Sequence, residues 1–104
     1  MGGQVTSVGE ALTEEIIYDP ATGYPLNFNW IDYHIPTMAD MPDVEPALLE
    51  VWKGGGEYGA CGIGEGVVTC TPRAIANAIY NAIGVRINDI PFKPEKILAA
   101  LGRT

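Results

Sequence analysis

Cysteine and histidine, the residues that cross-link small domains or bind structural metals, are nearly missing from this sequence. Its 104 residues include two cysteines, Cys61 and Cys70, and one histidine, His34. Two cysteines do not make a disulfide framework, and one histidine leaves the common types of zinc site short of ligands. The scarcity predicts a chain without a protein-held metal, suited to the reducing cytoplasm.

Positive charge is also scarce. Six lysines and arginines stand against thirteen aspartates and glutamates, which gives a formal net charge of −7. Nucleic acids and anionic membranes bind basic patches, so neither is an expected partner. No apolar run approaches the roughly 20 residues of a membrane-spanning helix, and no basic segment followed by an apolar core predicts a secretory signal. The balance predicts a surface that faces water or a basic partner subunit.

The residues that are present have the composition of a globular domain, with 47% hydrophobic and 18% charged. The length predicts a single domain over residues 1–104. Near its start, apolar residues recur at spacings of three and four, which predicts one apolar helical face within residues 4–17. These residues are Val5, Val8, Leu12 and Ile16.

Two further helices are predicted from their end signals. Thr71 is a good N-cap, Pro72 suits the first helical position, and Gly84 is a typical stop. Pro94 marks a second such start and opens a helix over Glu95–Leu101. The chain is therefore expected to contain two or three helices.

Short strands are predicted in two places. Residues 24–33 are aromatic and mixed in character, which favours an extended segment. Residues 47–52 follow Pro46 and include four apolar or aromatic side chains beside Ala47, which is typical of a strand of about six residues. Together with the helices, these segments predict an α+β fold in which two or three helices pack on a few short strands.

A glycine-rich loop over residues 54–66 is the most distinctive feature. Seven of its thirteen residues are glycine, so it cannot be the interior of a regular element. Glu65 lies in this loop, a few residues before a predicted helix, where backbone approaches a ligand closely and a buried carboxylate can act as a general base. The alternative is structural, because Glu65 could simply satisfy the N-terminal end of the following helix.

The loop and its surroundings resemble one enzyme family. The segment Gly59–Gly66 (Gly-Ala-Cys-Gly-Ile-Gly-Glu-Gly) looks like the Gly-Ala-x-Gly-x-Gly-Glu loop of the molybdenum-cofactor subunits of xanthine dehydrogenases and aldehyde oxidoreductases. Further segments resemble this family in the right order, so that the resemblance spans nearly the whole chain. They are Ala11–Glu15, Asp32–Thr37 followed by Met41-Pro42, Thr71–Ile79 and Ile90–Ile97.

The resemblance implies a molybdenum hydroxylase. In that family the motif glutamate, here Glu65, sits beside molybdenum bound by a pterin dithiolene and takes a proton from a metal-bound hydroxyl, which attacks an aldehyde or N-heterocycle. The resemblance places Gly62, Ile63 and Gly64 at the molybdopterin cofactor. It also places Thr6 there, where the family often has glutamine, so that contact by the first helix depends on a shorter side chain.

The resemblance also implies partners. The family's site is assembled from several segments of a far longer polypeptide, and electrons leave through iron–sulfur clusters and often FAD in other domains or subunits. We therefore expect the chain to be the C-terminal fragment or a small subunit of such an enzyme. Alone, it is expected to be inactive, to bind no cofactor, and to self-associate through apolar surface on which the remainder of the molybdenum subunit packs.

Two other functions remain open from the residues alone. One is a small nucleotide- or phosphate-binding module, since Gly62-Ile63-Gly64-Glu65-Gly66 precedes a predicted helix. Its Gly-x-Gly-x-Gly spacing differs from the dinucleotide-binding Gly-x-Gly-x-x-Gly pattern. The other is a non-catalytic interaction domain that kept the fold and lost the chemistry.

Overall fold

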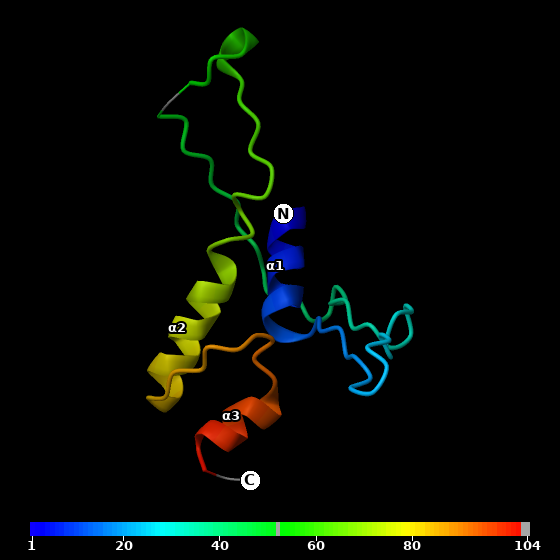
Figure 1. Cartoon of the computed structure of the whole chain (residues 1–104). Coiled ribbons are helices and arrows are strands. Elements are labelled where there is room, and N and C mark those ends of the chain that lie inside the picture. Colours follow the sequence, from blue (N-terminus) through cyan, green and yellow to red (C-terminus); the bar gives the residue numbers. More distant parts are fainter. Residues whose placement is uncertain (52, 103–104) are drawn as a thin grey trace.

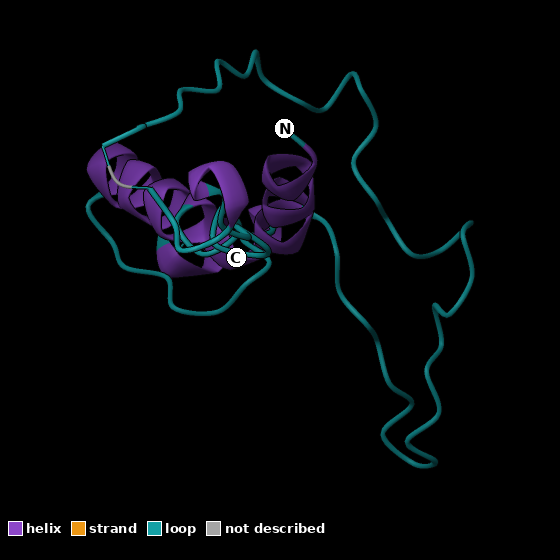
Figure 2. Ribbon diagram, turned by 90° about the horizontal axis from the view of Figure 1, so that it is seen from above, coloured by secondary structure: helices purple, strands orange, loops and turns teal. Residues whose placement is uncertain are grey.

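Three helices joined by long irregular segments make up the computed structural model, which describes residues 1–51 and 53–102 (Figure 1). The helices are α1 (Gly2–Leu12), α2 (Thr71–Ile83) and α3 (Pro94–Ala100), and a short 3-10 turn, η1 (Glu57–Gly59), lies between α1 and α2. Helices α1 and α2 contact each other, and the three helices gather on one side of the molecule while the loops run outward (Figure 2).

Helix α1 is shorter than the predicted 4–17 and begins earlier. It ends at Leu12 because the amides of Thr13 and Glu14 both donate to the carbonyl oxygen of Gly9, at 2.9 and 2.8 Å. Beyond it, the Asn27 side chain accepts from the Ile17 amide at 2.8 Å and donates to the Glu15 carbonyl oxygen at 2.6 Å. This tertiary contact holds residues 15–17 out of the helix, a position that β-branched isoleucines tolerate well.

Helices α2 and α3 follow the prediction closely. The N-cap of α2 is Cys70, with no side-chain cap, and Thr71 is already helical, so the predicted start was wrong by one residue. Gly84 ends α2 in the left-handed region with φ +74°, as expected. Pro94 opens α3 as predicted, with Lys93 as its N-cap.

The strand predictions were wrong for the part of the chain that the structure describes. In the first segment only one antiparallel bridge forms, between Tyr18 and Pro25. Proline has no N–H to extend a ladder, and Asn29 turns the chain by accepting from the Ile31 amide at 2.9 Å. Residues 47–51 have no regular structure, since no neighbouring segment pairs with them, and Trp52 lies outside the described residues. The elements are helical rather than α+β.

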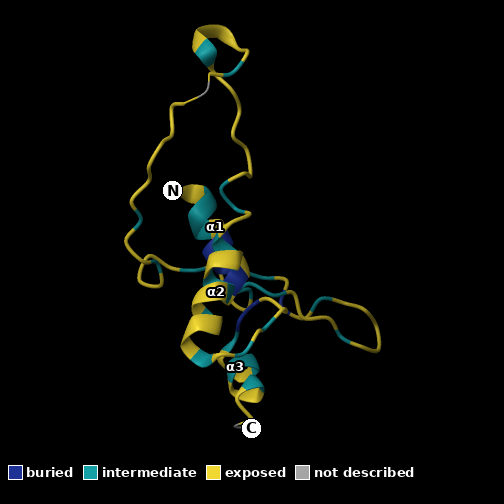
Figure 3. Cartoon of the chain, turned by 90° about the vertical axis from the view of Figure 1, so that its left-hand side faces the viewer, coloured by how far each residue is buried: buried dark blue, intermediate teal, exposed yellow. Residues whose placement is uncertain are grey.

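The core is small for the size of the chain. In the described part of the chain, the buried hydrophobic core consists of Val8, Ala11 and Phe92. The Phe92 amide donates to the Ala11 carbonyl oxygen at 2.7 Å. The accessible surface is 8301 Å², whereas a compact protein of 11.1 kDa exposes about 5,700 Å². Burial is confined to the surroundings of α1 (Figure 3). A large part of the chain is therefore bare.

One ion pair ties the residues after α1 to the start of α3. The Lys93 ammonium donates to the Glu15 carboxylate, and this hydrogen bond lowers the pKa of Glu15, with further lowering from the charges of Lys93 and Lys96. Both side chains of the pair are about one-third exposed, at 34% and 35%. Solvent therefore screens the interaction, and its contribution to stability is small.

This pair predicts a pH dependence of stability. Because the folded pKa of Glu15 lies below its unfolded value, the stabilisation is present above about pH 4.3 and is lost as the pH falls through the folded pKa. Urea unfolding at pH 6 and pH 3 should therefore show a larger acid loss for the original chain than for Lys93→Met. The exposed Lys53→Met serves as control. An equal acid loss in all three proteins would exclude a contribution from this pair.

Candidate active site

Residues 44–66 form an arm that extends away from the helices (Figure 1), and Glu65 is the last residue but one of this segment. Gly62, Gly64 and Glu65 are exposed, and Ile63 is 71% exposed. The carboxylate therefore faces out of the chain, and not into the small core around α1. A side chain that acts on a ligand from outside the chain must be exposed, and Glu65 is.

The glycines leave the outer face of this loop open. A Cβ atom built on Gly62 or Gly64 has no heavy atom within 4 Å. Gly64 also has φ +50°, a backbone conformation that side chains with a Cβ rarely adopt. The main chain at these two positions is therefore accessible to a bound group, and position 64 requires glycine for its conformation.

Consecutive turns hold the main chain of Glu65 although its side chain is in solvent. The Gly66 amide donates to the Ile63 carbonyl oxygen at 3.2 Å, and the Val68 amide donates to the Glu65 carbonyl oxygen at 2.9 Å. Further on, the Thr69 hydroxyl donates to the Gly66 carbonyl oxygen at 3.1 Å. These turns lead into α2, so the main chain of Glu65 is held by hydrogen bonds in the turns that precede this helix.

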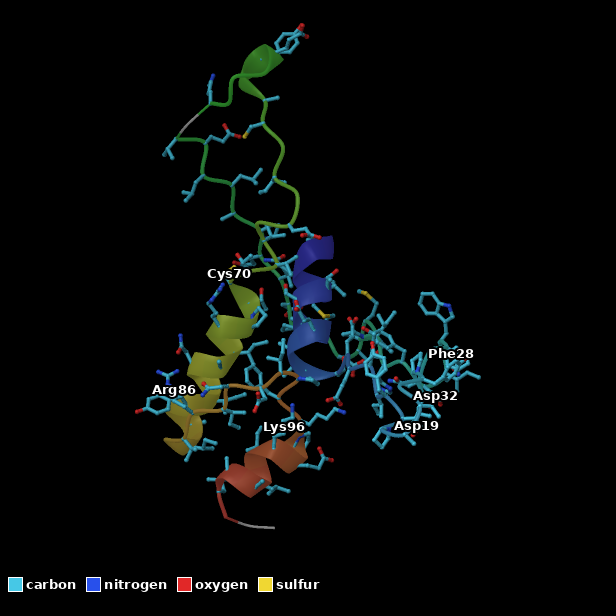
Figure 4. The ribbon with its side chains drawn as sticks, in the orientation of Figure 1. Asp19, Phe28, Asp32, Cys70, Arg86 and Lys96 are labelled. Atoms are coloured by element: carbon cyan, nitrogen blue, oxygen red, sulfur yellow. The ribbon has the colours of Figure 1, made fainter. Side chains whose placement is uncertain are left out.

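The residues after Glu65 pack against α1. A Cβ on Gly3 would overlap the Cγ2 methyl of Val67 and would lie 3.7 Å from Cγ2 of Val68, so the valines sit against the bare backbone of this glycine. Figure 4 shows Cys70 at the start of α2, where the base of the arm reaches α1. The sequence analysis missed Gly3, Val67 and Val68, for which the Gly2-Gly3 pair is the only signal of close packing in the sequence.

Thr6, the fourth candidate cofactor residue, lies one turn along α1 from Gly3. It is exposed, and its hydroxyl donates to the Gly2 carbonyl oxygen of its own helix at 3.2 Å. The structure thus brings the helix of Thr6 and the loop of Glu65 together through Gly3 and Val67. The hydroxyl hydrogen of Thr6 is used within α1, which leaves its oxygen as an acceptor only.

The two alternative roles of the glycine loop are not favoured by the geometry. The N-cap of α2 is Cys70, with no side-chain cap, and Glu65 precedes the first residue of this helix by six positions. In phosphate-binding loops the glycines lead into the helix N-terminus, whose amides hold the anion. Here the turns of Val67–Cys70 separate the glycines from α2. The loop therefore lacks the arrangement of a phosphate loop.

No set of protein ligands for a metal accompanies the loop. Within residues 1–51 and 53–102, no group of three or more histidine, cysteine, aspartate or glutamate side chains could hold a metal ion. Cys61 and Cys70 are both free and exposed. In the same residues, no helix combines the length and the apolar character needed to cross a membrane.

An apolar hollow lies on a different part of the chain. It has a volume of about 500 Å³ and belongs to the segment around Phe28, where Tyr24 and Phe28 stack edge to face with centroids 5.6 Å apart. Figure 4 shows Phe28, Asp19 and Asp32 on this segment, on the side of α1 opposite α2. Its lining is Ile16, Tyr18, Pro25, Asn27, Phe28, Asn29, Trp30, Tyr33 and Ile35. None of these residues belongs to the Glu65 loop, so the hollow is not part of the candidate site.

Comparison with known families finds a match for the first part of the chain. The family model described as a molybdopterin cofactor-binding domain matches residues 1–42, which include α1 and the segment that follows it. Glu65 lies outside the matched residues. The match therefore concerns the part of the chain that carries Thr6.

Individual relatives match most of the chain. It is 38% identical over 96 residues to the xanthine dehydrogenase molybdenum-binding subunit of Escherichia coli O157:H7, with 92% of the chain and 13% of that protein covered. It is 36% identical over 110 residues to the aldehyde oxidoreductase molybdenum-binding subunit PaoC of Escherichia coli strain K12, with 97% and 14% covered. The chain thus spans only about an eighth of the length of these relatives.

A solved structure also matches. The crystal structure of quinoline 2-oxidoreductase from Pseudomonas putida 86 superposes with a TM-score of 0.84 and 32% sequence identity, covering 97% of this chain and 13% of that one. The extended arm and the three helices are thus similar in arrangement to a segment of a much larger chain.

Proposed function

Since the chain belongs to the family of molybdenum-binding subunits of xanthine dehydrogenases and aldehyde oxidoreductases, we propose that it is the C-terminal segment of such a subunit and that Glu65 is its general base. The substrate class is an aldehyde or an electron-poor N-heterocycle. The observation that carries the proposal is the exposed carboxylate of Glu65 on a loop whose glycines leave their outer face open.

The residues of the loop fit a molybdenum–pterin cofactor. A metal held by pterin sulfurs needs no set of protein ligands, and the described residues contain none. The open faces at Gly62 and Gly64 admit a bulky group to the main chain, while a Cβ at either position would stand in its path. Gly62, Ile63 and Gly64 would line the cofactor on this side, with Thr6 reaching it from α1.

When bound, the cofactor supplies the two-electron redox chemistry and makes an oxygen nucleophile acidic. The contribution of this chain is the base. One carboxylate oxygen of Glu65 would accept the proton released at this site, and the turns formed by the Gly66 and Val68 amides hold the main chain that carries it.

The bare surface of the chain supports a larger enzyme around it. The accessible surface exceeds that of a compact protein of this mass by about 2,600 Å², more than the roughly 800 Å² that one partner buries in a standard interface. Leu48, Leu49 and Tyr58 of the arm are 81%, 87% and 102% exposed. We infer that the remainder of the molybdenum subunit covers them, and that iron–sulfur and flavin domains or subunits take the electrons.

The proposal is tested by comparing the purified chain with the complete subunit in its enzyme. Molybdenum content and oxidation of an aldehyde or xanthine with an artificial electron acceptor are measured for both. The complete enzyme is expected to bind molybdenum and turn over, while the chain does neither, because most of the site lies outside it. Turnover by the chain alone would contradict the proposal, and micromolar binding of NAD to the chain would favour a nucleotide-binding module.

A further inference from the structure

We propose that Gly3 of α1 is a positioning residue for Glu65, because the loop that carries Glu65 packs through Val67 against the main chain of Gly3. The inference depends on the proposed function only for the role of Glu65. The contact that carries it is independent of that role, since it concerns packing between α1 and the residues that follow the glutamate.

Val67 can pack this closely against position 3 because glycine has no Cβ. The Cβ of an alanine at position 3 would overlap Cγ2 of Val67 and would lie 3.6 Å from Cβ of the same valine. Valine has a single side-chain torsion, which is stiff. The methyl group of Val67 can therefore leave only by changing rotamer or by moving the main chain of the loop away from α1.

The distance in sequence from this contact to the carboxylate is short. Val67 is two residues after Glu65, and the next amide, that of Val68, donates to the Glu65 carbonyl oxygen at 2.9 Å. A displacement of Val67 from α1 is transmitted to Glu65 through this turn. On the other side of Glu65, the position of a Cβ on Gly62 or Gly64 is open, with no heavy atom within 4 Å of it.

Position 2 offers a matched control. Gly2 and Gly3 are both in the first turn of α1, but a Cβ on Gly2 meets nothing within 4 Å. Alanine at either position favours the helix by a similar amount. Only the variant at position 3 disturbs the contact with Val67, so the difference between the two variants measures the effect of this contact.

The experiment compares Gly3→Ala and Gly2→Ala in the complete enzyme and in the 104-residue chain. In the enzyme, a shift of about 1 Å at the base is expected to lower kcat roughly 10- to 100-fold for Gly3→Ala, with KM and molybdenum content unchanged. In the chain, hydrogen exchange at the Val68 amide is expected to be faster in Gly3→Ala alone. Gly2→Ala is expected to match the original protein in every measurement.

A second substitution separates positioning from misfolding. Removing the two methyl groups of Val67 in the double variant Gly3→Ala, Val67→Ala makes room for the new Cβ and is expected to restore kcat and slow exchange at Val68. Equal effects of the two glycine variants, or full kcat in Gly3→Ala, would overturn the proposal. If Glu65→Gln were itself fully active, the proposed function would fail, whatever the glycine variants show about packing.

Discussion

Replacing Glu65 by glutamine in the complete enzyme is expected to lower kcat by roughly 10²- to 10⁴-fold, the range over which a positioned general base contributes. Glutamine has the same size and keeps hydrogen-bonding capacity, but its amide does not accept a proton near neutral pH. KM is expected to change little, because the proposed role is in proton transfer and not in substrate binding. Steady-state oxidation of an aldehyde or xanthine with an artificial acceptor measures both constants.

Glu57→Gln is the control for this substitution. Glu57 begins η1 at the tip of the same arm and is exposed like Glu65, so the change in charge and size is identical. Molybdenum content should be unchanged in both variants, and kcat should fall only for position 65. Full activity of Glu65→Gln with molybdenum retained would assign the chain to the third class considered, an interaction domain without chemistry.

The second large effect is expected in the stability of the chain itself. Phe92→Ala should lower the free energy of unfolding by about 3–5 kcal/mol, as usual when a buried aromatic side chain is removed. Phe92 is 5% exposed, and its amide is bonded to Ala11, so it joins the segment before α3 to α1. With so few buried side chains, few contacts remain to compensate, and the variant is expected to be largely unfolded. Urea unfolding followed by circular dichroism measures the change.

Phe28→Ala is the matched control, since the sequence contains only these two phenylalanines. Phe28 is 65% exposed and makes an edge-to-face pair with Tyr24, worth about 0.5–1.5 kcal/mol. Its removal should therefore cost no more than that. A loss for Phe92→Ala as small as that of Phe28→Ala would mean that the segment before α3 is not anchored to α1 in solution.

The accuracy of the sequence predictions followed the range of the interactions involved. Helices α2 and α3 were predicted well because their signals are local, with Pro72 and Pro94 in the first turns and Gly84 as the stop. The end of α1 was predicted wrongly. The chain after this helix is held by the hydrogen bond between Ile17 and Asn27, which lie ten residues apart in the sequence. The strands failed for the same reason, since a strand depends on a neighbour that the pattern of residues 47–52 does not reveal.

The candidate site divides in a similar way. The order of motifs around Glu65 was enough to indicate the family, and the glycines at 62 and 64 were enough to predict a loop open to a ligand. The contact between Gly3 and Val67 was not predictable, because it joins residues 64 positions apart in the sequence and depends on the relative placement of α1 and α2.

What the amino-acid sequence by itself determined is thus the local chemistry: where α2 and α3 begin and end, which carboxylate stands among glycines, and which family the segments resemble. Tertiary structure alone decided where α1 ends, that the arm projects instead of pairing as a strand, and that Glu65 rests on α1 through its neighbours. The physical reason is that propensity and backbone sterics act between adjacent residues, whereas packing and hydrogen-bond pairing act between residues that only folding brings together.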